Sequence, residues 1–149
     1  MSLKNRLLDD IKQAMRDRAK ELLGVLRLAS AAIKQREVDE RIELDDTAVI
    51  ATIEKMIKQR RESIVHFEQG RRPDLVAKEA AEIEILQAYM PEQLSEAELD
   101  ALINDAIAST GASEMRDMGK VMGIIKSKAQ GRTDMGVASA KIKTRLSSS

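Results

Sequence analysis

Apolar residues in this chain recur every three or four positions, and this period constrains the fold more than any other feature. Near the N-terminus Leu3, Leu7 and Ile11 step by four, which is the spacing of one face of an α-helix. No segment alternates apolar and polar residues with the period of two expected for a half-buried strand. The sequence therefore predicts an all-α fold.

Capping and breaking residues mark where the predicted helices begin and end. The charged segment "EVDERIELDDT" has no apolar period, so we predict that it connects two helices. The second of these is expected to be capped by Asp46 or Thr47 and to stop at Gly70. Pro73 suits the first turn of the following helix, and Pro91 disfavours helical geometry in the residue before it.

Three shorter helices are predicted after the second proline. The segment "SEAE", from Ser95 to Glu98, has the spacing of a capping box, and Gly111 ends the helix that it opens. Two further helices begin near Asp117 and Asp134. Both are short, and basic residues gather toward their ends.

We place the domain boundary at "MPEQLS", the segment around the second proline. Residues 1–92 are predicted to form an N-terminal bundle of antiparallel helices, with a break in the first apolar stripe near Asp17. Residues 93–149 are predicted to form a small three-helix C-terminal domain.

The charges of the chain cancel overall but are unevenly placed along it. There are 25 basic and 25 acidic residues, which give a net charge of zero. Residues 91–114 carry six acids and no base, whereas residues 115–149 carry eight bases against two acids, a net charge of +6. A basic segment of this kind favours an anionic partner, and the alternative is an ordinary solvated helical surface. Charge alone leaves both alternatives open.

The chain has few residues from which to build an active site. It has no cysteine, which excludes disulfides, thiolate metal sites and cysteine nucleophiles. His66 is the only histidine and is expected to be a surface or half-buried helix residue. The acidic clusters lack the paired His-and-acid spacing of a metal site in a helical bundle, and no phosphate-binding or dinucleotide-binding glycine pattern occurs. We therefore expect no metal, no cofactor and no catalytic activity from the chain alone.

Long apolar segments are absent from the sequence. No run reaches the length of a membrane span, and the N-terminal segment "MSLKNRLLDDIKQAM" lacks the apolar stretch of a secretory signal. These features predict a cytoplasmic protein with no membrane partner.

The triplet Asp-Met-Gly, which begins at Asp117 and again at Asp134, is the most informative motif. Both aspartates are expected to cap the helices that follow, and Gly119 and Gly136 then leave backbone N–H groups open in the first turn. A helix start carries partial positive charge and can hold an oxyanion such as a phosphate. The alternative is that the glycines let two short helices pack closely, with Gly123 on the same face as Gly119.

The segments "DMGKVMGIIK" and "GRTDMGVASAKIKTRL" resemble the signature of the GatB/YqeY family. This family comprises small YqeY-like proteins and the C-terminal tail domain of GatB, a subunit of tRNA-dependent amidotransferase. The segments "MSLKNRLLDDIKQAM", "VLRLASAAIKQRE" and "AYMPEQLSEAEL" also fit the stand-alone YqeY-like pattern, so the resemblance covers essentially the whole chain. Carried onto this sequence, the motif positions are Asp117, Gly119, Lys120, Val121, Met122, Gly123, Gly131, Asp134 and Gly136.

The resemblance implies an all-helical protein with a small three-helix tail, which in the amidotransferase reaches the elbow of the tRNA. Other parts of that enzyme activate the carboxylate on the tRNA-linked amino acid and free ammonia from glutamine, and this chain is too short to contain them. Val121 and Met122 are expected to lie in the core, and Lys120 is the base most expected to meet RNA.

We therefore expect a tRNA-binding accessory protein that recognises RNA shape and phosphates through its basic C-terminal helices. One alternative is a helical adaptor that docks on an aminoacyl-tRNA-handling enzyme through an apolar patch at Met115, Met118 or Met135. A third possibility is the glutamine-dependent carbon–nitrogen ligase activity of an amidotransferase. The expected RNA-binding groups are Lys120, Lys126, Lys128, Arg132, Lys141 and Lys143, with the backbone at Gly119 and Gly136.

Overall fold

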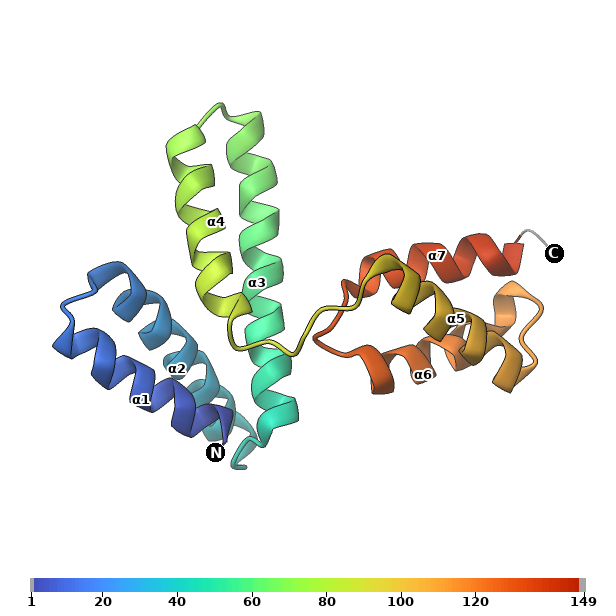
Figure 1. The fold of residues 1–149 in the computed structure, drawn as a ribbon, viewed down its shortest axis with the longest axis horizontal. Helices are drawn as coiled ribbons and strands as arrows, with labels where there is room; N and C mark the ends of the chain where they lie inside the picture. The colour runs from blue at the N-terminus through green and yellow to red at the C-terminus, as the bar shows by residue number, and fades with distance from the viewer. Residues whose placement is uncertain (1, 148–149) are drawn as a thin grey trace. The chain divides into compact units, whose positions relative to one another are not determined.

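The computed structural model describes residues 2–147, and every regular element within that range is helical (Figure 1). The predicted all-α fold is therefore confirmed. The chain divides into two compact units, Met1–Met90 and Pro91–Ser149. The elements are α1 (Leu3–Arg16), α2 (Lys20–Glu40), α3 (Asp46–Gln69), α4 (Pro73–Gln87), α5 (Glu96–Thr110), the 3₁₀ turn η1 (Met115–Asp117), α6 (Met118–Ala129) and α7 (Met135–Ser147).

The first unit consists of two helical hairpins, α1–α2 and α3–α4, which pack together through α2 (Figure 1). The predicted break near Asp17 is confirmed, because α1 ends at Arg16 and Asp17 is its C-cap. Apolar residues at helical spacing form the core because each helix turns one stripe inward. The buried core residues of this unit are Leu7, Ala14, Val25, Leu26, Ala29, Ile33, Leu44, Val49, Ile53, Met56, Ile57, Leu86 and Tyr89.

Arginines rather than glycines take the left-handed backbone conformation where three helices of this unit end. Arg18, Arg41 and Arg71 have φ values of 55°, 54° and 55°. Gly70 does cap α3 as expected, but its φ is −81°, and it is the next residue that turns left-handed. Glycine is the usual residue in this conformation, so the sequence carries only weak signals for these helix ends.

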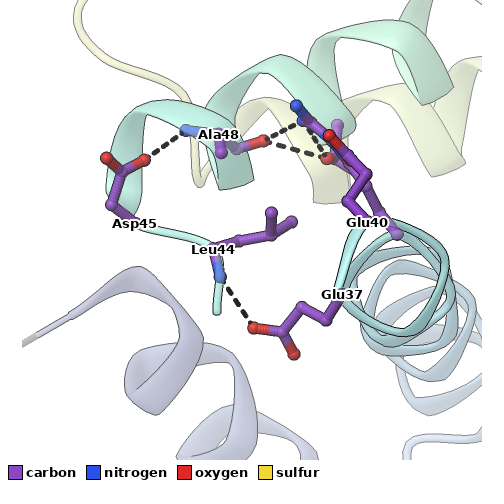
Figure 2. Close-up of polar contacts among 7 residues, drawn as sticks. Glu37, Glu40, Leu44, Asp45 and Ala48 are labelled. Atoms are coloured by element: carbon purple, nitrogen blue, oxygen red, sulfur yellow. Dashed lines mark hydrogen bonds and ion pairs between the residues drawn. The ribbon is translucent and has the colours of Figure 1, made fainter. Parts of the chain in front are cut away.

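The connection between α2 and α3 is shorter than predicted, because α2 continues to Glu40 (Figure 2). The carboxylate of Glu37 accepts a hydrogen bond from the Leu44 N–H at 2.8 Å. The cap of α3 is Asp45, which accepts from the Ala48 N–H at 2.9 Å, so the expectation of Asp46 or Thr47 is wrong by a residue or two. The acidic residues of this segment therefore close a helix–helix turn.

The second unit packs α5, α6 and α7 around a separate core. The predicted capping box is confirmed: the Ser95 hydroxyl accepts from the Glu98 N–H, and the Glu98 carboxylate accepts from the Ser95 N–H, both at 3.1 Å. Gly111 ends α5 with a φ of 69°. The last helix of the first unit, α4, ends at Gln87, before the turn that leads to Pro91.

The two helices that follow the repeated Asp-Met-Gly motif, α6 and α7, bury equivalent positions in this core. Buried positions in α7 lie 17 residues after their counterparts in α6. Val121 is fully buried and Met122 packs against the core, as expected. The buried set in the two helices is Val121, Ile125 and Ala129 in α6, and Ala138, Ile142 and Leu146 in α7.

Candidate nucleic-acid interface

Lys126 and Lys143 occupy equivalent positions on the two repeated helices. Each follows a fully buried isoleucine, Ile125 or Ile142, and each is itself exposed. Lys128, two residues further along α6, is exposed as well. The described residues provide no ion-pair partner for these three lysines. Their charges are therefore available to an external anion.

Asp117 does not cap α6, so that expectation is wrong. Its carboxylate turns back to accept from the N–H groups of Ser113 and Glu114, at 3.1 and 3.2 Å. These bonds lower the pKa of Asp117, and the nearby charge of Lys120 contributes to the same shift. Because η1 leads directly into α6, the Met118 N–H already donates a hydrogen bond to the Met115 carbonyl in η1. The start of α6 is therefore partly satisfied by the preceding turn and is less open than predicted.

Asp134 does behave as predicted at the start of α7. It accepts a hydrogen bond from the Gly136 N–H at 2.8 Å. A Cβ atom added to Gly136 would lie 3.1 Å from the same carboxylate oxygen. A larger residue at this position would therefore crowd the capping carboxylate, and that carboxylate occupies one of the donors that an anion would use.

The glycines of α6 do not mediate helix packing, so that alternative is wrong. Gly119 and Gly123 are exposed, and a Cβ atom added to either would meet nothing within 4 Å. Lys120 lies beside Gly119 and is exposed too. The outer side of α6 is thus a surface where the helix backbone can be approached closely, with exposed lysines around it.

Lys141 is tied to α5 by two carboxylates and is not a free cation. Its ammonium donates to Asp100 at 2.9 Å and to Glu96 at 3.1 Å. The hydrogen bonds to Asp100 and Glu96 raise the pKa of Lys141. This side chain therefore holds α7 against α5, and we no longer count it among the groups that meet RNA.

Arg132 holds the segment that enters the second unit. Its Nε donates to the Glu92 carbonyl at 2.9 Å, and its own carbonyl accepts from the Leu94 N–H at 2.7 Å. Gln93 adds a bond from its side-chain amide to the Gly131 carbonyl at 2.7 Å. Arg132 therefore has a structural role in this unit, in addition to any role toward a ligand.

The acidic partners of Lys141 lie far from it along the chain, so the clustering of the cations in sequence did not reveal them. Glu96 and Asp100 lie 45 and 41 residues before Lys141. The sequence signal was the run of six acidic residues in 91–114, of which Glu96, Glu98, Asp100 and Asp105 lie on α5. The exposed lysines of this unit lie on α6 and α7.

The methionine patch expected of an adaptor does not form. Met115 is 40% exposed, but Met118 and Met135 pack against the core of the second unit. His66 is exposed on α3, as expected. Within residues 2–147, no three histidine or acidic side chains are grouped so that they could hold a metal ion. None of the described helices is both long enough and apolar enough to span a bilayer.

Comparison with protein-family models gives a match to the family described as "Yqey-like protein" over residues 4–146. Three curated relatives carry the name "Altered inheritance of mitochondria protein 41, mitochondrial". The protein from Pyrenophora tritici-repentis is 35% identical over 92% of this chain and 77% of its own length. The Eremothecium gossypii protein is 36% identical over 71% of this chain, and the Saccharomyces cerevisiae protein is 30% identical over 78%. The matches span 62% and 66% of the lengths of these two relatives.

The expectation of a cytoplasmic protein is contradicted by these relatives, whose names describe them as mitochondrial. The inference failed because an apolar N-terminal stretch marks secretion only. Segments that direct import into mitochondria are amphipathic and rich in arginine, so the lack of an apolar stretch does not exclude them.

Proposed function

The chain belongs to the YqeY-like family, and from this premise we propose that it is a tRNA-binding accessory protein. Its binding surface is the outer side of α6 and α7, where Lys120, Lys126, Lys128 and Lys143 contact phosphates. The observation that carries the proposal is that these four lysines are exposed while Lys141 is neutralised internally. The resemblance of the repeated motif to the GatB tail supports tRNA as the polyanion.

Recognition of folded RNA fits the composition of the surface better than recognition of unpaired bases. Single-stranded RNA is usually held by stacking on aromatic side chains. The chain has only Phe67 and Tyr89, both in the first unit, and Tyr89 is buried. Lysines and an approachable helix backbone instead suit phosphates and ribose hydroxyls along a paired region.

The scarcity of side chains suited to catalysis supports an accessory role for this chain. A hydrolytic or acyl-transfer site needs a nucleophile with a base held beside it. The chain has no cysteine, and its single histidine is exposed on α3, away from the lysine-bearing helices in sequence. We therefore propose binding without turnover, and an amide-transfer reaction would need catalytic groups from another protein.

Titration of labelled tRNA at several salt concentrations tests the proposal. If the four exposed lysines each neutralise one phosphate, the slope of log K against log salt should be about −3 to −4. The variant Lys120→Glu with Lys126→Glu should bind much more weakly than the unchanged protein. Failure to bind at low salt, or an affinity that does not depend on salt, would remove the proposal.

A further inference from the structure

The outward side of α2 carries a second stripe of small and apolar residues, interrupted by Gln35, which we call the α2 seam. Its members are spaced four, three, four and three residues apart, which is the 3.5-residue repeat of a coiled-coil contact. All of them are exposed, including Leu28 at 52% and Val38 at 63%. The seam consists of Gly24, Leu28, Ala31, Gln35 and Val38.

This seam is not the side by which α2 joins its own unit. The buried residues of α2 are Val25, Leu26, Ala29 and Ile33, which face the core. A Cβ atom added to Gly24 would meet nothing within 4 Å, so no neighbouring element of the first unit covers that end of the seam. A helix that is apolar on two sides is typically covered on both.

Two basic residues border the seam along one side. Arg27 and Lys34 each precede a seam residue directly, which places them at the flanking positions that select partners in coiled coils. Both are exposed, and the described residues provide no ion-pair partner for either. On the seam itself, the Gln35 side-chain amide donates a hydrogen bond to the Asp39 carboxylate at 2.9 Å.

A groove of about 520 Å³ runs along the other side of the seam, between α2 and α3. Gln35, Asp39 and Glu40 contribute to its α2 wall, and Lys55 adds an exposed cation from the α3 wall. Glu40 is paired with Arg36, so Asp39 is the one acid of the groove without an ion-pair partner among the described residues. Arg36 of α2 links the two walls of the groove, because its guanidinium donates to the Ala48 carbonyl of α3 at 3.1 Å and to the Thr52 hydroxyl of α3 at 3.3 Å. Figure 2 shows this junction, where the capped first turn of α3 faces α2.

We propose that the α2 seam and this groove bind an amphipathic helix of a partner protein that carries acidic residues beside its apolar stripe. Helix-in-groove recognition uses apolar anchors at this spacing, and charge complementarity selects the partner. Arg27 and Lys34 on one side and Lys55 on the other supply the positive charge.

A second copy of the chain fits this surface poorly. In an antiparallel pairing the flanking residues Arg27 and Lys34 would face the same residues of the other copy and repel them. In a parallel pairing Lys34 would face Asp39 of the other copy, but Arg27 would have no acidic partner, so only one of the two flanking cations would be matched. The inference concerns the first unit and does not depend on RNA binding by the second.

Fluorescence anisotropy with the full chain and two designed peptides tests this inference. Both peptides are three-heptad helices with leucine on the apolar stripe, one flanked by glutamate and the other by lysine. We expect the glutamate peptide to bind at least about tenfold more tightly than the lysine peptide. Substituting Leu28→Glu with Val38→Glu should weaken that binding at least about tenfold, because each removes a buried apolar contact.

The matched control is Val65→Glu on α3, because Val65 is also 52% exposed but lies outside the seam and groove. It should leave peptide binding unchanged, and circular dichroism should show that all variants remain folded. Equal binding of the two peptides, or binding that survives Leu28→Glu with Val38→Glu, would overturn the inference. A dimer in sedimentation that Leu28→Glu dissolves would also overturn it, because a second copy would then occupy the seam. Affinity for tRNA should not change in these variants, so the two proposals can fail separately.

Discussion

Neutralising Lys126 and Lys143 should weaken tRNA binding, whereas neutralising Lys141 should mainly weaken the fold. The first two occupy equivalent positions on α6 and α7, are exposed, and have no ion-pair partner among the described residues. Lys141 instead donates to two carboxylates of α5. The three lysines lie within 18 positions of one another, so overall charge cannot explain a difference between them.

The size of the effect follows from counterion release. Each phosphate contact contributes about 0.9 to the slope of log K against log salt, which corresponds to about eightfold in affinity at 0.1 M salt. The variant Lys126→Gln with Lys143→Gln should therefore bind about 60-fold more weakly at that salt concentration, and its slope should become less negative by about 1.8. Lys141→Gln should leave the slope within about 0.5 of the unchanged protein.

Anisotropy of labelled tRNA at four salt concentrations measures both quantities, and thermal unfolding measures the fold. The pKa of Lys141 is raised from its ordinary value of 10.5, so its contribution to stability is present below that pH and is lost as the pH rises above it. Lys141→Gln should lower the unfolding temperature at pH 7 and should lower it less at high pH. If Lys141→Gln makes the slope less negative by about 0.9, which is half the change expected for the double variant, the division between free and internally paired lysines is wrong.

Three further predictions follow from other parts of the structure. Gly119→Ala should stabilise the second unit by about 1 kcal/mol, because alanine favours the helix and the site is exposed with open surroundings. Gly136→Ala should not stabilise it, because the added carbon would disturb the cap of α7. Thermal unfolding of the two variants tests this difference. Ile142→Ala should destabilise the second unit by about 3 kcal/mol, seen as faster hydrogen exchange in α5–α7 with the α1–α4 core unchanged. Burial and the hydrogen bond from its hydroxyl to Asp10 raise the pKa of Tyr89 above its ordinary 10.0. Ultraviolet titration of this single tyrosine should therefore show ionisation well above pH 10 in the folded protein, and stability should fall as the pH rises past 10. Ionisation near pH 10 would contradict the burial of this side chain.

Several features that depend on residues within about four positions of one another were predictable. The apolar period identified the helices, and the Ser95–Glu98 capping box forms as its spacing predicted. The second copy of the repeated motif also caps α7 through Asp134. In each case the interacting groups are brought together by helix geometry alone, which the order of residues specifies.

The Asp117 turn shows where local reasoning stopped being sufficient. Asp117 and Asp134 are both followed by Met-Gly, yet only Asp134 caps its helix in the expected way. The difference is the 3₁₀ turn before α6, which brings the N–H groups of Ser113 and Glu114 within reach of Asp117. The carboxylate of a capping residue accepts from whichever backbone N–H groups lie within reach, and these include donors of the preceding chain as well as those of the helix that follows.

The sequence by itself determined which segments are helical, which side of each helix is apolar, and that positive charge accumulates toward the C-terminus. Tertiary structure decided which of those charges remain available: Lys141 meets carboxylates 41 and 45 residues away, while Lys126 meets none among the described residues. Periodicity reports the direction of a side chain relative to its own helix. Its ionic partners depend on which other helix lies beside it, and that depends on how all the apolar stripes are buried together.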